Sequence, residues 1–360
     1  MPNEAQGKEF VRGHSGLYET LCKSGNWQAA QEGRLHTLLF EITDKCFGSC
    51  KYCFSASNEH RGLFLPPETV YSILDDAWEM GVREILLSGG DPLLHPNWYE
   101  FACYMVDKGF ILHVLPSLLL SKKQAKQIVD LGAQVLIHID TLNQEDYNEV
   151  HHNPRTLEAK IQGYRNLLEA GMPPEKAWVC ITYTRAAARH IEETVDWHVD
   201  EMGANWINFA IFKTEGFGSP HQSFEPSVEE IKRALLYRAK KFNDESSLRF
   251  GSSDAGKCFC KTYFVLKPDG RVTPCPMLSA LAVGNIHQTP FRQLVESNLD
   301  RLTFNFEVQG YCGEECPDRE VCFGCRAVAY HYTGDVTSSD PKCWKNPANE
   351  DYVFEAGAGS

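Results

Sequence analysis

Residues 36–53 read HTLLFEITDKCFGSCKYC and join an apolar segment to a cluster of cysteines. The first part, residues 36–43, is rich in apolar and β-branched residues and predicts a buried strand. Cys46, Cys50 and Cys53 follow in a C-x3-C-x2-C pattern. The loop that holds them therefore lies at the carboxyl end of a strand, where α/β folds place their functional sites.

Short apolar runs alternate with amphipathic helical segments from about residue 36 to residue 240. This alternation predicts strand–helix units and a parallel sheet. Six strands are expected, at 36–43, 82–88, 111–117, 134–140, 178–184 and 205–212. Six such units form either an open doubly wound sheet or an incomplete barrel.

The side-chain alternation within these strands favours the barrel, because one face of several strands carries polar residues near the carboxyl end. These residues are Glu41, Thr43, Ser88, His113, Ser117, His138, Asp140, Thr182 and Asn208. The predicted fold is α/β, a partial (βα)6 TIM-like barrel with a polar lumen. The alternative is a flat sheet in which these polar groups are buried and hydrogen-bonded.

The segment after residue 250 has short Cys-, Gly- and Pro-rich stretches and few long apolar runs, so metal would have to stabilise it. The expected organisation is an N-terminal extension (1–35), the barrel (36–250), a cysteine-rich unit (251–350) and a disordered tail (351–360). An extension of about 35 residues is short for a leader-peptide-binding domain, which lowers the expectation of a peptide substrate.

The net charge of −13 and the pI near 5.5 disfavour a nucleic-acid partner. Neither a signal peptide nor an apolar span of membrane length is present, so we expect no membrane partner and a cytoplasmic location. In a reducing compartment, clustered cysteines indicate metal binding. Of the 14 cysteines, only Cys22, Cys103 and Cys180 stand alone, and these are expected to be small buried hydrophobes.

Three closely spaced thiolates can hold three corners of a [4Fe–4S] cluster and leave the fourth iron open for chemistry. The pattern Cys46, Cys50, Cys53 with the aromatic Tyr52 resembles the radical S-adenosylmethionine (SAM) superfamily. The sequence Ser88-Gly89-Gly90-Asp91-Pro92 resembles the GGEP motif of that family, with Asp91 in place of Glu. A structural zinc site and a purely electron-carrying iron-sulfur site are the alternatives for this loop.

The resemblance implies that SAM binds the open iron, with Tyr52, Gly89, Gly90 and Asp91 near the cofactor. It places Ser117 where relatives contact the ribose. His138 and Asp140 occupy the position of the family's SxD segment. Asp140 is the candidate general base, and a cofactor-contacting or structural carboxylate is the alternative.

Eight later cysteines, with Gly270, are similar to the SPASM extension of radical enzymes, which usually carries two auxiliary [4Fe–4S] clusters. By that pattern Cys260, Cys275 and Cys325, with Cys258 as the fourth ligand, hold the first auxiliary cluster. The second is held by Cys312, Cys316, Cys322 and Cys343. Zinc knuckles or a single auxiliary cluster remain as alternatives.

The resemblance implies a 5′-deoxyadenosyl radical that abstracts hydrogen from a substrate, with an external one-electron donor of flavodoxin or ferredoxin type. Auxiliary clusters favour a net two-electron oxidation, either dehydrogenation or radical cross-linking, of a small metabolite or a peptide. A tetrapyrrole-modifying radical enzyme is one alternative. The other, from a different class, is an iron-sulfur electron-transfer or zinc-binding protein.

Overall fold

A computed structural model describes residues 17–252, 254 and 256–349. Nine strands form one sheet in the order β6-β5-β4-β3-β2-β1-β7-β8-β9. The strands are β1 (Thr37–Glu41), β2 (Glu84–Ser88), β3 (Ile111–Val114), β4 (Gln134–Ile137), β5 (Ala177–Tyr183), β6 (Ile207–Ile211), β7 (Tyr263–Leu266), β8 (Arg271–Thr273) and β9 (Gly284–Asn285).

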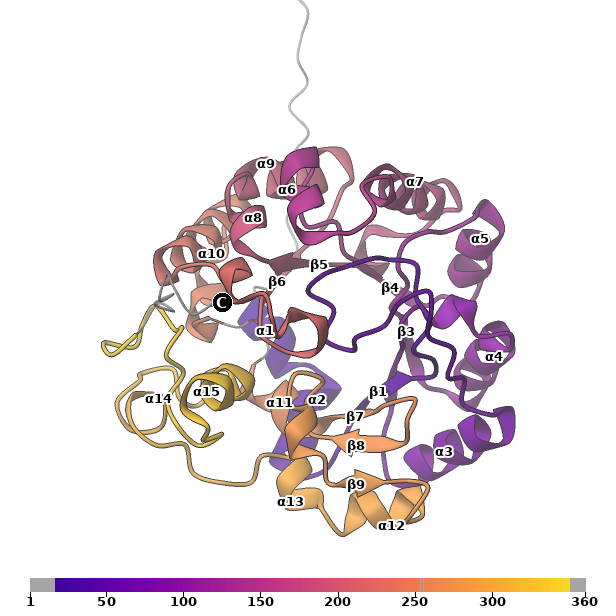
Figure 1. The fold of residues 1–360 in the computed structure, drawn as a ribbon. Coiled ribbons are helices and arrows are strands. Elements are labelled where there is room, and N and C mark those ends of the chain that lie inside the picture. Colours follow the sequence, from indigo (N-terminus) through magenta and orange to yellow (C-terminus); the bar gives the residue numbers. More distant parts are fainter. Residues whose placement is uncertain (1–16, 253, 255, 350–360) are drawn as a thin grey trace, which may run out of the picture.

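Strands β1 to β6 are mutually parallel, and helices on the outside connect them, as Figure 1 shows. This is the predicted partial barrel, and all six expected strands are confirmed. The expected segments 111–117 and 134–140 were longer than β3 and β4, because their last residues, Ser117 and Asp140 among them, continue past the sheet ladder into the loops.

The helices of the barrel surround the sheet, whereas those of the N-terminal segment lie nearer the centre of the view (Figure 1). They are α1 (Leu17–Cys22), α2 (Gly25–Gln31), α3 (Pro67–Glu79), α4 (Trp98–Lys108), α5 (Lys122–Asp130), α6 (Gln144–Val150), α7 (Thr156–Glu169), α8 (Arg185–Ala188), α9 (Ile191–Asp196) and α10 (Val228–Phe242). Local sequence sets their ends, since α5 and α10 both begin with a capping box at a serine, Ser121 and Ser227.

The two faces of the barrel sheet are both buried. On β1, Leu38 and Phe40 belong to the main core, which lies between strands and helices. Leu39 points the other way and packs with Leu86 and Val265. Burial on both faces explains why β1 reads as a continuous apolar run.

The C-terminal segment extends the same sheet, because β7 pairs in parallel with β1, and β8 and β9 follow in antiparallel order. Its helices are α11 (Lys257–Thr262), α12 (Phe291–Glu296), α13 (Leu299–Leu302), α14 (Tyr311–Glu314) and α15 (Arg326–Thr333). The expected disordered tail, 351–360, lies outside the described residues. No helix in the described part of the chain has the length and apolar character needed to cross a membrane.

Candidate active site

Cys46, Cys50 and Cys53 lie in the loop that follows β1. The Gly48 amide points at the Cys46 sulfur, with 3.2 Å between N and Sγ. Burial raises the pKa of the Cys50 thiol to about 11, so iron must displace a proton when it binds there. Ser49, between the first two cysteines, has a positive φ of 59°, a strained conformation of the kind found at functional sites.

Backbone contacts fasten this loop to the segment after α6. The amide of Lys51 donates to the carbonyl of Val150 at 2.9 Å, and the amide of His152 donates to the carbonyl of Ser49 at 2.9 Å. Cys50 itself forms a β-bridge with His151. The position of the three thiols therefore depends on residues about a hundred positions downstream.

Gly89 and Gly90 follow β2 and lie directly against the cysteine loop. The Gly90 amide donates to the Thr43 carbonyl at 2.7 Å, and the Asp91 amide donates to the Lys45 carbonyl at 2.8 Å. A Cβ at Gly90 would lie 2.3 Å from the Lys45 carbonyl oxygen and 2.9 Å from Cys46 Cβ. Only glycine permits this approach, so the Gly-Gly pair positions the thiol loop as well as leaving backbone free to meet a cofactor.

A cavity of about 190 Å³ opens beside these elements and is hereafter called the barrel cavity. It is lined by all three cysteines of the loop and by the strand ends, including Tyr52, Ser88, Gly89, Gly90, Ser117, His138 and Thr182. Burial, together with the charge of Lys160, holds the pKa of His138 well below its usual range, so its imidazole is neutral. The sequence-predicted residues are thus brought together at one place, apart from the two carboxylates.

The carboxylates Asp91 and Asp140 lie behind the cavity wall, with their oxygens occupied. Asp91 accepts from the Leu93 amide at 3.0 Å and from the Ser117 hydroxyl. Asp140 accepts from the Thr182 amide at 2.7 Å and from the Tyr52 hydroxyl. Both carboxylates therefore hold residues that line the cavity.

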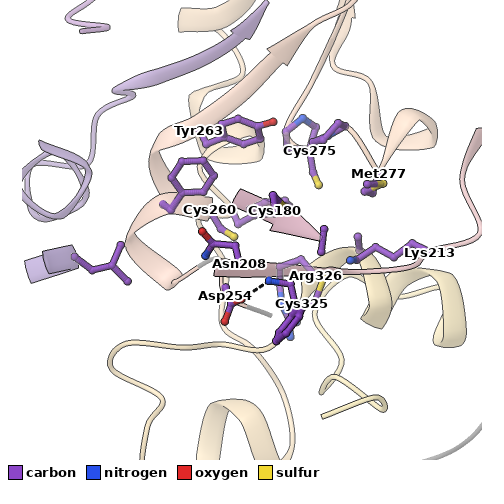
Figure 2. Close-up of a pocket in the computed structure, with 18 of the residues that line it drawn as sticks. Cys180, Asn208, Lys213, Asp254, Cys260, Tyr263, Cys275, Met277, Cys325 and Arg326 are labelled. Atoms are coloured by element: carbon purple, nitrogen blue, oxygen red, sulfur yellow. Dashed lines mark hydrogen bonds between the residues drawn. The ribbon is translucent and has the colours of Figure 1, made fainter. Parts of the chain in front are cut away.

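A second cavity, of about 360 Å³, lies between the barrel and the C-terminal segment and is hereafter called the junction cavity. Cys260, Cys275 and Cys325 line it, together with Asp254 (Figure 2). One oxygen of Asp254 accepts from the buried Arg238 and from the Phe209 amide, while Oδ1 is buried without a partner. Three thiols and an unsatisfied carboxylate oxygen suit a metal cluster.

Cys258 does not line the junction cavity with the other three cysteines. It lies on α11 only two residues before Cys260, so the two side chains point to different sides of the helix. Cys258 is buried near Cys22 of the N-terminal segment. The structure thus brings Asp254, and not Cys258, to the cavity that Cys260, Cys275 and Cys325 line.

Cys312, Cys316, Cys322 and Cys343 line a third, small cavity of about 10 Å³. The Gly324 amide points at Cys322 Sγ and the Asp340 amide at Cys312 Sγ, each at 3.4 Å. A Cβ at Gly251 would lie 2.8 Å from Cys343 Sγ. Glycine and backbone amides beside four thiols form a suitable cradle for a cluster, and the four are those expected together from the sequence.

Among the residues that the structure describes, no three His, Cys, Asp or Glu side chains converge on a position for one metal ion. A [4Fe–4S] cube does not require such convergence, because each iron takes its own thiolate. The three sets of thiols fit clusters in this respect.

Three functional candidates were not predicted from the sequence: Cys180, Asp254 and Lys160. Cys180 lines both the barrel cavity and the junction cavity, although it was expected to be an ordinary buried residue. No feature of the sequence around Asp254 identifies it as a functional residue. Lys160 could have been noticed, because it falls on the apolar face of α7 with Leu157, Tyr164 and Leu167.

Comparison with known proteins gives two family matches. The sequence family described as the Radical SAM superfamily matches residues 40–197. The model described as an iron-sulfur cluster-binding domain, SPASM, matches residues 258–326. Together the two matches include the first cysteine loop and most of the later cysteines.

Two relatives align over most of their length. An AdoMet-dependent heme synthase of Methanosarcina barkeri is 27% identical over 352 residues, covering 87% of this chain and 97% of that protein. A PqqA peptide cyclase of Streptomyces rochei is 25% identical, covering 86% of this chain and 89% of that protein.

Solved structures share the fold at lower identity. Streptococcus suis SuiB bound to its precursor peptide SuiA has a TM-score of 0.65 at 15% identity, over 94% of this chain and 83% of that chain. Native anSMEcpe with bound AdoMet has a TM-score of 0.64 at 16% identity, over 84% of this chain and 93% of that chain.

Proposed function

Because the chain belongs to the radical SAM superfamily and carries a SPASM extension, we propose that it carries out a net two-electron oxidation of its substrate, by abstracting a hydrogen atom and then removing one electron. It is a radical SAM enzyme, and its cofactors are SAM and [4Fe–4S] clusters. When bound and reduced, the first cluster would supply the electron that splits SAM into methionine and the 5′-deoxyadenosyl radical, which takes the hydrogen. The chain's own residues bind the cofactors, exclude water and orient the substrate.

The common wall of two cavities carries this proposal. Cys180, Ala210, Lys213 and Met277 line both the barrel cavity and the junction cavity. A substrate at this wall lies between the thiols of the first cysteine loop and those of Cys260, Cys275 and Cys325. A cluster on the far side can accept the electron that a substrate radical loses, which supports oxidation as the reaction class.

We assign the ligands by cavity. Cys46, Cys50 and Cys53 would hold the first cluster. Cys260, Cys275 and Cys325 would hold the first auxiliary cluster, with Asp254 as the fourth ligand in place of Cys258, because its Oδ1 has no other partner. The second auxiliary cluster takes the four cysteines of the third cavity, so residues 251–350 act as the auxiliary-cluster unit.

In the barrel cavity, the backbone of Gly89 and Gly90 would receive the amino group of SAM, and Ser117 and His138 would contact the rest of the cofactor. Asp91 orients Ser117, and Asp140 orients Tyr52. We therefore assign Asp140 a positioning role, and not the role of general base for which it was a candidate from the sequence.

The junction cavity is lined mainly by aromatic and apolar groups, among them Trp178, Phe259 and Tyr263, with Lys213 as a cation. The part of this cavity beside the common wall would take a small metabolite or one side chain of a peptide, which is our leading substrate class. A tetrapyrrole is the second candidate, favoured by the likeness to the heme synthase over nearly the full length of that protein.

Electrons would come from an external one-electron donor of flavodoxin or ferredoxin type. Cys46 lines a surface cleft of about 620 Å³ together with Phe47, Lys51 and His152, which gives such a donor access to the first cluster. All 14 cysteines are free thiols, and with thiolate-bound clusters this favours a reducing compartment, for which we propose the cytoplasm.

The test is anaerobic reconstitution with iron, sulfide, dithionite and SAM. The wild-type chain should release 5′-deoxyadenosine, and a Cys46→Ala variant should not. A Cys46/Cys50/Cys53 triple Ala variant should keep about eight irons in two auxiliary clusters. Equal 5′-deoxyadenosine from the wild type and Cys46→Ala would refute the enzyme assignment, and zinc in place of iron would refute the cluster assignment.

A further inference from the structure

Lys160 is a fully buried cation in the wall behind the first cysteine loop. It lies on α7, and its side chain has 0% exposure. Within the described part of the chain, its Nζ has no hydrogen-bond partner. A buried ammonium without a partner is costly, so its presence calls for a countercharge.

The groups around Lys160 come from three elements. The Tyr147 ring of α6 lies 5.8 Å from Nζ, measured to the ring centroid. Asp140 follows β4, and Cys46 and Cys50 belong to the cysteine loop; all of these act on Lys160 electrostatically, Cys50 most strongly. His138 and His151 also feel its charge, and burial keeps both of them neutral.

Asp140 does not neutralise Lys160 by direct contact, because its oxygens are bound to the Tyr52 hydroxyl and the Thr182 amide. Asp140 therefore acts on Lys160 only without direct contact, and further negative charge arises at the cysteine thiolates once they hold a cluster. We propose that the Lys160 ammonium is the built-in countercharge of the cluster held by Cys46, Cys50 and Cys53, and that it raises the reduction potential of that cluster. The inference depends on the proposed function in one respect only, namely that these three cysteines are the ligands of the cluster.

The direction of this change in reduction potential follows from the positive charge of Lys160. Reduction adds one electron to the cluster, and a fixed cation nearby stabilises the more negative state. The effect is strong because the site is buried and poorly screened. Removing the charge should therefore make the cluster harder to reduce, without removing a ligand.

The first experiment is an EPR-monitored redox titration of the reconstituted holoenzyme, which follows the signal that SAM perturbs. Lys160→Met should lower the equilibrium constant for reduction by tenfold or more, which is about 59 mV for one electron. Lys160→Arg should stay within threefold of the wild type, because it keeps the charge. Lys126→Met, which removes an exposed lysine of α5, should leave the midpoint unchanged.

The second experiment measures the melting temperature of Lys160→Met in two backgrounds. In the Cys46/Cys50/Cys53 triple Ala chain, which lacks the first cluster, the substitution should raise the melting temperature, because it removes a buried charge that Asp140 alone compensates only in part. In the cluster-bound wild-type background it should lower the melting temperature. This reversal of sign is a coupling that a merely structural lysine would not show.

An unchanged midpoint in Lys160→Met, or the same sign in both backgrounds, would overturn the proposal. If SAM affinity fell tenfold or more with the midpoint unchanged, Lys160 would be a cofactor ligand and the proposal would be wrong. If Lys160→Met failed to load iron, Lys160→Gln would be titrated in its place, with the same expected shift. Absence of 5′-deoxyadenosine from the wild type, with the midpoint shift present, would refute the proposed function and leave this inference standing.

Discussion

Gly90→Ala tests whether close contact between the end of β2 and the cysteine loop sets the geometry of the site. The added Cβ would lie 2.3 Å from the carbonyl oxygen of Lys45 and 2.6 Å from its carbonyl carbon. These are backbone atoms, which cannot swing aside as a side-chain end can. The loop must move, and overpacking of this kind costs about 1–3 kcal/mol.

Movement of the loop would also weaken two hydrogen bonds that join the segments, at the Gly90 and Asp91 amides. Each contributes about 1 kcal/mol, so a total cost of about 3–5 kcal/mol is expected. If that free energy is lost from cofactor binding, SAM affinity should fall by about a hundredfold or more. Cys46 would be displaced as well, so iron content should fall by about four atoms per chain.

The assay is SAM binding by anaerobic equilibrium dialysis, with iron counted on the same samples. Gly62→Ala is the matched control, since no atom lies within 4 Å of the Cβ it would add and its φ is not strained. It should bind SAM and iron as the wild type does. A Gly90→Ala chain with full iron and with SAM affinity within threefold of the wild type would refute the reasoning.

Three further substitutions have defined outcomes. Tyr52→Phe removes the hydroxyl that donates a hydrogen bond to Asp140 and should lower the free energy of unfolding by about 1–3 kcal/mol. The melting temperature of the cluster-bound chain should fall accordingly, and an unchanged melting temperature would contradict this. Asp254→Ala should alter the EPR signal of the first auxiliary cluster while leaving the SAM-sensitive signal intact, and identical spectra would argue against ligation. Glu84 is desolvated, but hydrogen bonds led by His113 outweigh this effect and lower its pKa from 4.5 to about 2. Its contribution to stability, about 3 kcal/mol, is therefore complete above pH 4.5 and lost as the pH falls toward 2. Glu84→Gln should be much less stable than the wild type at pH 7 and closer to it at pH 3, as measured by denaturant unfolding; a gap that does not change with pH would contradict this.

The strand pattern and the cysteine groups could be predicted because both depend on local sequence. Apolar alternation marks each strand, and short spacing within a loop brings thiols together. Spacing alone does not tell which way Cys258 faces relative to Cys260. The segment forms helix α11, so two cysteines two residues apart face different ways.

The partners of buried polar groups could not be predicted, because they depend on tertiary contacts. Asp91 was expected to face the cofactor, but the segment after β3 brings the Ser117 hydroxyl to it, and this hydroxyl donates a hydrogen bond to the Asp91 carboxylate. Asp254 reaches the junction cavity through its buried ion pair with Arg238, sixteen residues earlier. The surroundings of Lys160 could not be predicted either, because they depend on how α7 is oriented relative to the cysteine loop, and only the folded barrel fixes that orientation.

The contacts between the cysteine loop and residues 150–152 also bear on the order in which the protein is made. Ser49 and Lys51 bond to backbone groups that the ribosome adds about a hundred residues later. Until then the loop has no fixed template, and its thiols have no defined arrangement to offer an iron-sulfur donor. Maturation of this site must follow folding of the barrel, so a defect at residues 150–152 would show itself as failed metal loading in an otherwise intact chain.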